Sequence, residues 1–230
     1  MGSIGSNLQD VRQRIARACA SAGRGENSVT LLAVGKTFPA QALREAHAAG
    51  QTAFGENYVQ EALAKMDALA DLRPQLQWHL IGPLQSNKTR PVAEAFDWVH
   101  SVDRLKIAQR LAEQRPPALP PLQLCLQVNI SGEVSKSGLA PADVPAVAAA
   151  VAALPRERVR LRGLMAIPEP AGDLQAQRGP HRALRELLDA LRGQGLELDT
   201  LSMGMSADLE AAVLEGATLV RVGSAIFGLR

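Results

Sequence analysis

Residues 29–36 read VTLLAVGK, a run of apolar and mostly branched side chains that ends in glycine and lysine. A continuous apolar run of this kind is typical of a parallel strand that is buried on both faces. A helical pattern follows at once, because Pro39 stands where a first turn would begin and Gly50 is placed to end the helix. The stretch therefore predicts one strand–helix unit.

The same alternation continues to the end of the chain. Further strands are predicted at 52–57, 76–82, 96–102, 122–130, 159–167, 200–205 and 219–227. Helical patterns separate them, and an amphipathic helix at 4–22 precedes the first strand. Eight such units predict a single-domain (βα)8 TIM-type barrel over residues 1–230, in which the N-terminal helix covers the face that an eighth helix would take. A doubly wound open sheet is the competing arrangement, but it usually has fewer strands.

Composition excludes several classes of function. The chain has 230 residues, 47% of them hydrophobic, and a net charge of +2, which argues against a dedicated nucleic-acid binder. Aromatic residues make up only 3%, too few for a platform that stacks bases. No apolar run approaches the roughly 20 residues that span a bilayer, and residues 1–9 lack the basic start, apolar core and cleavage pattern of a signal peptide. Two cysteines, Cys19 and Cys125, cannot form a four-ligand zinc site. We therefore expect a cytoplasmic protein with no metal site and no membrane partner.

Lys36 is the first candidate for chemistry. In a (βα)8 barrel the reactive groups lie at the C-terminal ends of the strands, and Lys36 ends the first one. An ammonium group held in the barrel mouth would lose hydration, which favours the neutral, nucleophilic amine and predicts a Schiff base with a carbonyl group. On position alone, a lysine that merely extends to solvent at the rim is the stronger interpretation.

Two segments late in the chain, MGMS at 203–206 and VGS at 222–224, carry groups suited to a phosphate. Ser206 adds a hydroxyl where a strand leads into a helix, whose first N–H groups and dipole favour an anion. Gly223 allows close backbone approach, and Ser224 offers both an N–H and a hydroxyl. Barrels commonly bind phosphate after strands seven and eight. In the alternative interpretation these residues are only an N-cap and a packing glycine, and the aspartate two residues after the first serine would compete for the helix dipole.

Six blocks of the sequence, taken together, match a known family. They are VGKT (34–37), FGENYVQE (54–61), WHLIGPLQSNK (78–88), GLMAIP (163–168), SMGMSAD (202–208) and RVGSAIFG (221–228). In the same order they resemble the pyridoxal-phosphate homeostasis protein family (YggS or proline synthetase co-transcribed type), which is related to the N-terminal domain of alanine racemase. The resemblance covers essentially the whole chain. One departure is that Phe38 stands where some members carry a second lysine.

The resemblance implies a barrel that binds pyridoxal 5′-phosphate. It implies that Lys36 forms the Schiff base with this cofactor. It also implies that Ser206, Gly223 and Ser224 form the phosphate cradle.

Three further residues are predicted to contact the cofactor. Arg221 lies two residues before the phosphate glycine, so its side chain can enter the same mouth, with a surface or core-paired arginine as the alternative. Arginine is a permanent cation that only donates, so its contact with the pyridine nitrogen would keep that nitrogen unprotonated and weaken carbanion stabilisation. Asn57 is expected to hydrogen-bond the ring oxygen, with the N-cap of the next helix as the alternative. Met165 is expected to pack on the ring, with a place in the core as the alternative.

Other polar residues carry weaker signals. His79 lies in the middle of a strand among apolar neighbours, which favours a core histidine over a base. Lys88 and Lys136 follow strands three and five, and each is either a solvated loop lysine or an acceptor of the cofactor during transfer.

Two functions from different classes fit this pattern. In the first, the protein holds and delivers the cofactor in intracellular pyridoxal-phosphate homeostasis with no catalytic residue of its own. Its partners are the cofactor and, as recipients, apo forms of pyridoxal-phosphate enzymes, and we expect a monomer. The second is an amino-acid racemase, which needs an acid or base on both faces of the bound substrate. The single tyrosine, Tyr58, opens the second helix and we expect no further domain after the eighth strand, so the first function is favoured. A sugar-phosphate barrel enzyme that uses Lys36 as an aldolase lysine explains the phosphate groups but not the six blocks.

Overall fold

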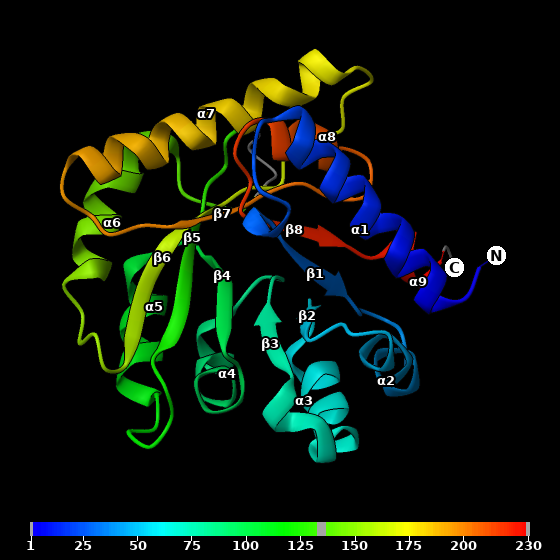
Figure 1. Ribbon diagram of the computed structural model, residues 1–230. Coiled ribbons are helices and arrows are strands. Elements are labelled where there is room, and N and C mark those ends of the chain that lie inside the picture. Colours follow the sequence, from blue (N-terminus) through cyan, green and yellow to red (C-terminus); the bar gives the residue numbers. More distant parts are fainter. Residues whose placement is uncertain (1, 133–136, 229–230) are drawn as a thin grey trace.

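The computed structural model describes residues 2–132 and 137–228. Its strands pair in parallel and in sequence order, and β1 closes on β8, so they form a closed barrel (Figure 1). The strands are β1 (Thr30–Val34), β2 (Ala53–Glu56), β3 (Gln77–Leu80), β4 (Trp98–Val102), β5 (Leu122–Gln127), β6 (Val159–Met165), β7 (Thr200–Ser202) and β8 (Leu219–Val222). The predicted (βα)8 barrel is confirmed, although most strands are shorter than the apolar runs that predicted them.

Helices surround the barrel. They are α1 (Ile4–Ser21), α2 (Ala40–Ala48), α3 (Val59–Ala68), α4 (Thr89–Ala95), α5 (Leu105–Gln114), α6 (Val144–Ala152), α7 (Leu174–Gly193), α8 (Leu209–Leu214) and α9 (Ser224–Phe227). Helix α1 packs against α8, α9 and α2, where an eighth outer helix would lie (Figure 1). Within residues 2–132 and 137–228, no helix is long and apolar enough to cross a membrane.

The prediction of a strand over 219–227 is wrong in its second half. Strand β8 ends at Val222, Gly223 takes φ −117° and ψ −72°, and the helical turn α9 follows. Ile226 is fully buried within this turn, and Asn7 of α1 donates from Nδ2 to its carbonyl at 2.8 Å. A short apolar run fits a strand or a buried helical turn equally well, so only this packing decides between them.

The core has two parts. Large apolar side chains such as Trp78, Phe54 and Phe96 fill the layer between the strands and the helices. Inside the barrel, Leu32 and Leu219 belong to a separate small apolar cluster. Polar side chains fill another part of the barrel interior, and they lead directly to its mouth.

Candidate functional site

The structure places all seven predicted cofactor-binding residues at the C-terminal ends of neighbouring strands. They are Met165 at the end of β6, Ser206 after β7, Arg221, Gly223 and Ser224 on and after β8, Lys36 after β1, and Asn57 after β2. These five strands are consecutive around the closed barrel. The residues therefore share one arc of the barrel mouth.

Lys36 stands in a tight turn. The N–H of Phe38 donates to the carbonyl of Gly35 at 3.0 Å, so Lys36 and Thr37 occupy the two central positions. Thr37 has φ +66°, the positive value that the second central position of a type II turn requires and that glycine normally supplies. The Lys36 side chain is exposed. Our expectation that burial in the mouth strips the ammonium group of water is therefore wrong for this structure.

The two predicted phosphate-binding serines meet in space. Their hydroxyl oxygens, Ser206 Oγ and Ser224 Oγ, lie 3.3 Å apart although the residues belong to different loops. A Cβ atom on Gly223 would lie 3.1 Å from the carbonyl oxygen of Val34, so this position has little room for a side chain beside β1. The arrangement presents two hydroxyl groups beside the turn that opens α9.

The interpretation of Ser206 as an N-cap is wrong, because α8 begins at Leu209 and Asp208 holds the cap position. Asp208 accepts the N–H of Met205 through Oδ1 at 2.7 Å, so one of the N–H groups that we expected to face a phosphate is already bound. Its other oxygen accepts from Nε2 of His181 at 2.9 Å. Burial alone would raise the pKa of Asp208, but these two hydrogen bonds, together with the charges of His181 and Arg221, lower it. The carboxylate therefore fixes the loop that carries Ser206.

Asn57 has an unsatisfied acceptor. Its Oδ1 is buried and has no partner among the residues that the structure describes. It is not the N-cap, since Tyr58 precedes α3. Asn57 lines a cavity of about 270 Å³ together with Gly82, where a Cβ atom would lie only 2.2 Å from the Asn57 carbonyl oxygen. A buried acceptor without a donor is costly, so this atom is well suited to a ligand that donates a hydrogen bond.

Arg221 is buried at the end of β8 with only 3% of its surface exposed. Its Nη1 donates to Ser202 Oγ at 2.7 Å and its Nη2 to the Ala166 carbonyl at 2.8 Å. Burial lowers the pKa of Arg221 to about 10, so the side chain remains a cation at neutral pH. Guanidinium carries five N–H donors, and these two bonds leave others for a ligand. Met165, the neighbour of Ala166, is fully buried.

A chain of hydrogen bonds continues from Arg221 across the barrel interior. Ser202 Oγ lies 2.7 Å from Nδ1 of His100, and His100 Nε2 lies 3.0 Å from Nδ1 of His79. Because Ser202 Oγ accepts from Arg221, its own hydrogen is free to donate to His100, whose Nε2–H then donates to His79. Burial lowers the pKa of His79 to about 3 and that of His100 well below its usual range, so both are neutral. This agrees with His79 as a core histidine.

Sequence reasoning missed a buried cluster of charges behind the Lys36 turn. Nζ of Lys65 donates to both carboxylate oxygens of Glu56, at 2.8 and 3.0 Å, and to Glu61 at 2.6 Å. It also donates to the Gly35 carbonyl at 2.8 Å. Burial raises the pKa of Glu56 to about 7, although Lys65 opposes the rise. The only signal in the sequence was the four-residue spacing of Glu61 and Lys65, which is also that of an ordinary surface pair.

Two lysine candidates remain. Lys88 is half-buried in the short helix Ser86–Lys88, and Lys136 lies outside the described residues. Among the residues described, no group of three or more His, Cys, Asp or Glu side chains could hold a metal ion.

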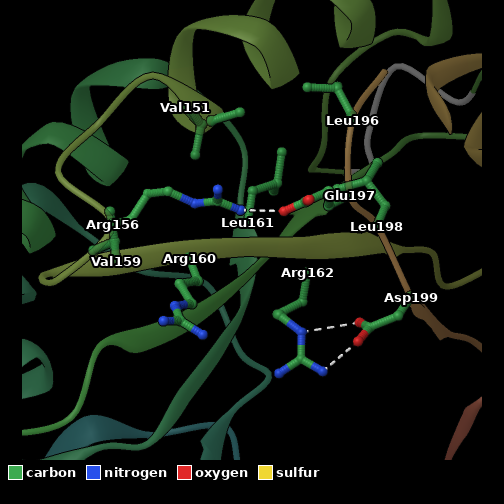
Figure 2. Close-up of a pocket in the computed structure, with 11 residues that line it drawn as sticks. Val151, Arg156, Val159, Arg160, Leu161, Arg162, Leu196, Glu197, Leu198 and Asp199 are labelled. Atoms are coloured by element: carbon green, nitrogen blue, oxygen red, sulfur yellow. Dashed lines mark hydrogen bonds and ion pairs between the residues drawn. The ribbon is translucent and has the colours of Figure 1, made fainter. Parts of the chain in front are cut away.

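A cavity of about 360 Å³ lies at the opposite end of β6 (Figure 2). Arg156 pairs there with Glu197 at 2.5 Å, and Arg162 pairs with Asp199 at 2.5 Å. These charges neutralise one another, and the cavity lies at the starts of the strands rather than at their C-terminal ends. We assign it no part in the site.

Comparison with known proteins identifies the class to which this fold and site belong. The chain belongs to the alanine racemase N-terminal domain family, whose model matches residues 6–230. Over 100% of its length it is 64% identical to the pyridoxal phosphate homeostasis protein of Pseudomonas aeruginosa (97% of that protein is covered). It is 52% identical to the protein of the same name from Escherichia coli K12 (98% covered).

Solved structures of other proteins have the same fold. PipY of Synechococcus elongatus PCC7942, solved with PLP bound, is 44% identical and superimposes with a TM-score of 0.81 over 93% of this chain and 100% of that one. An alanine racemase of Clostridium difficile 630 shares the fold at 14% identity and a TM-score of 0.72, covering 98% of this chain and 57% of that one.

Proposed function

We propose that this chain binds pyridoxal 5′-phosphate as a Schiff base on Lys36 and acts in intracellular pyridoxal-phosphate homeostasis, without substantial catalysis of its own. The observation that carries the proposal is the single arc of the mouth, which brings together an amine, a pair of hydroxyls, a buried cation and a buried acceptor that none of the described residues pairs. The names of the relatives and the cofactor in PipY support the same conclusion.

The residues present fit the cofactor group by group. Ser206 and Ser224, with their hydroxyls 3.3 Å apart, are suited to donate to its phosphate. Asn57 Oδ1, which lacks a donor among the residues described, is suited to the ring hydroxyl. Arg221 has N–H groups left for the pyridine nitrogen, whereas Met165 is fully buried in this structure, as the alternative of a place in the core expects.

Lys36 is the residue to which the cofactor would be attached covalently. When bound, the cofactor supplies an aldehyde carbon. The Lys36 amine would condense with that carbon, and the aldehyde oxygen would leave as water. Hydrolysis reverses the attachment without any redox change, which suits a protein that holds and then releases its cargo.

The same residues disfavour the racemase alternative. Arginine cannot give a proton to the pyridine nitrogen at neutral pH, so Arg221 would leave the ring a weak electron sink. A racemase also needs acids or bases on both faces of its substrate. Tyr58, the single tyrosine, is 57% exposed at the start of α3. His79 and His100 bond to each other inside the barrel. Delivery to apo enzymes, a monomeric state and a cytoplasmic location belong to this proposal.

Absorbance and reductive trapping test it. We expect the protein to turn yellow with pyridoxal 5′-phosphate and borohydride to fix the cofactor on the peptide that contains Lys36. Lys36→Ala should lose the band, whereas Lys106→Ala, which removes an exposed lysine of α5, should keep it. A protein that stays colourless with added cofactor would overturn the proposed function.

A further inference from the structure

The turn that presents Lys36 is held in a conformation that its sequence disfavours. Among the residues described, Thr37 is the one non-glycine residue with a positive φ, and it is β-branched. Such a backbone is strained and persists only where the surroundings determine it. Something must therefore hold the turn from outside.

The charge cluster formed by Glu56, Glu61 and Lys65 supplies contacts on both sides of Lys36. Before it, Lys65 Nζ donates to the carbonyl of Gly35 at 2.8 Å. After it, Glu61 Oε1 accepts the N–H of Thr37 at 2.5 Å. The two clamping groups are joined to each other at 2.6 Å, since Glu61 and Lys65 stand one turn apart on α3.

One contact of this cluster joins β2 to α3. The ion pair between Glu56 and Lys65 does that, with side-chain exposures of 0% and 6%. Glu61, whose side chain is 28% exposed, adds little to that interface, yet it is directed at a peptide N–H beside Lys36. The hydrogen bonds of Lys65 to the Gly35 carbonyl and of Glu61 to the Thr37 N–H therefore act on the turn rather than on the packing of α3.

A third contact joins the turn to the helical turn α9, beside the predicted phosphate-binding serines. The ring of Phe38 packs against that of Phe227 with centroids 5.1 Å apart, and Phe227 lies in α9, which Ser224 opens. The turn is thus fixed to α3 on one side and to α9 on the other. A rigid link of this kind sets the separation between Lys36 and the serine pair.

We propose that Glu61 and Lys65 are positioning residues that clamp the two peptide groups flanking Lys36 and so hold its amine in place for attack on the aldehyde. This role rests on the proposed function and specifies how Lys36 is prepared for it. Neither residue touches the cofactor. They act through the backbone of the turn.

Glu61 offers a matched pair of variants. Glu61→Ala removes the oxygen that accepts from Thr37, whereas Glu61→Gln keeps an oxygen at the same place. In the cofactor-free protein, exchange of the Thr37 amide hydrogen, followed by NMR, should be about tenfold faster in Glu61→Ala, because a hydrogen bond to a charged acceptor is lost. Glu61→Gln should restore most of the protection. Glu94→Ala, which removes an exposed carboxylate of α4, should leave this exchange unchanged.

The second readout is the rate at which the absorbance band forms with pyridoxal 5′-phosphate. We expect Glu61→Ala to slow it about tenfold, Glu61→Gln to restore it, and Glu94→Ala to match the wild type. Lys65→Met alone would leave the buried carboxylate of Glu56 unpaired, so the role of Lys65 is tested in a double variant that also carries Glu56→Gln. The band should form more slowly in this double variant than in Glu56→Gln alone.

The outcomes separate the two proposals. If the wild type forms no band, the proposed function fails, whatever the Thr37 exchange shows. If the band forms but Glu61→Ala leaves both the Thr37 exchange and the rate of band formation unchanged, the positioning role is refuted and the function stands. Slower band formation that Glu61→Gln does not restore also refutes the clamp, because the retained acceptor would then be irrelevant.

Discussion

Glu56 should make the stability of this protein depend on pH in an unusual direction. Its carboxyl is fully buried at the end of β2, and burial raises its pKa from 4.5 to about 7 although Lys65 opposes the rise. Between these two values the folded protein keeps a proton that the unfolded chain releases. The contribution of Glu56 to the free energy of unfolding is therefore fully present below pH 4.5, and it is lost as the pH rises through about 7.

The size of the effect follows from the same two values. At about 1.4 kcal/mol for each pH unit, the loss across this window is about 3 kcal/mol. The measurement is urea unfolding of the wild type and of Glu56→Gln at pH 5, 6 and 8. The difference in unfolding free energy between the two proteins removes the contributions of groups common to both, such as Asp208 and the barrel histidines.

We expect the free energy of unfolding of the wild type, relative to that of Glu56→Gln, to fall as the pH rises to 7 and to level off above it. A difference that stays constant with pH, or that shifts in favour of the wild type, would refute the reasoning. A constant difference would mean that the attraction of Lys65 balances the cost of burying Glu56, and a shift in favour of the wild type would mean that the attraction outweighs that cost.

Three further predictions concern the interior and the mouth of the barrel. Ser202→Ala should lower the free energy of unfolding by about 2–4 kcal/mol, because it leaves buried groups of Arg221 and His100 without a partner, whereas Ser21→Ala on α1 should change it little in the same urea titration. Gly82→Ala should cost about 3 kcal/mol or more in thermal unfolding, because the new Cβ would lie 2.2 Å from the Asn57 carbonyl, whereas Gly172→Ala has nothing within 4 Å and should cost less than about 0.5 kcal/mol. Ser206→Ala and Ser224→Ala should each weaken binding of pyridoxal 5′-phosphate about tenfold in a spectroscopic titration, and equal affinity for unphosphorylated pyridoxal would contradict a phosphate site there.

The barrel was predictable because its signals are local and repeated. Each apolar run needs only its own residues to indicate a buried strand, and eight of them in alternation with helical patterns leave few arrangements. The arc of site residues followed from the same rule, since strand ends share one face. The turn to helix at Ser224–Phe227 was not predictable, because its apolar residues fit either structure and α1 decides between them.

The charge cluster was hidden for a different reason. Glu61 and Lys65 look like a solvated pair on a helix, and nothing in a linear pattern shows that the helix turns Lys65 toward Glu56 and the Gly35 carbonyl. The hydrogen-bonded chain from Arg221 to His79 joins residues of β8, β7, β4 and β3 across the barrel. Only barrel closure brings those strands face to face. Contacts between side chains of distant strands are the part that a single sequence leaves open.

The choice between a carrier and a racemase depends on exchange of the substrate α-proton. Arg221 remains cationic at neutral pH and can only donate, so a pyridine nitrogen beside it stays unprotonated and the ring withdraws electrons weakly. The loaded protein, incubated with L-alanine in deuterated water, should therefore incorporate deuterium and racemise no faster than free cofactor at the same concentration. The same preparation should restore activity to an apo pyridoxal-phosphate enzyme. Fast racemisation that Lys36→Ala abolishes would establish the enzyme instead. It would require a second acid–base group. Tyr58, exposed at the start of α3, and the paired histidines inside the barrel are poorly placed to supply one.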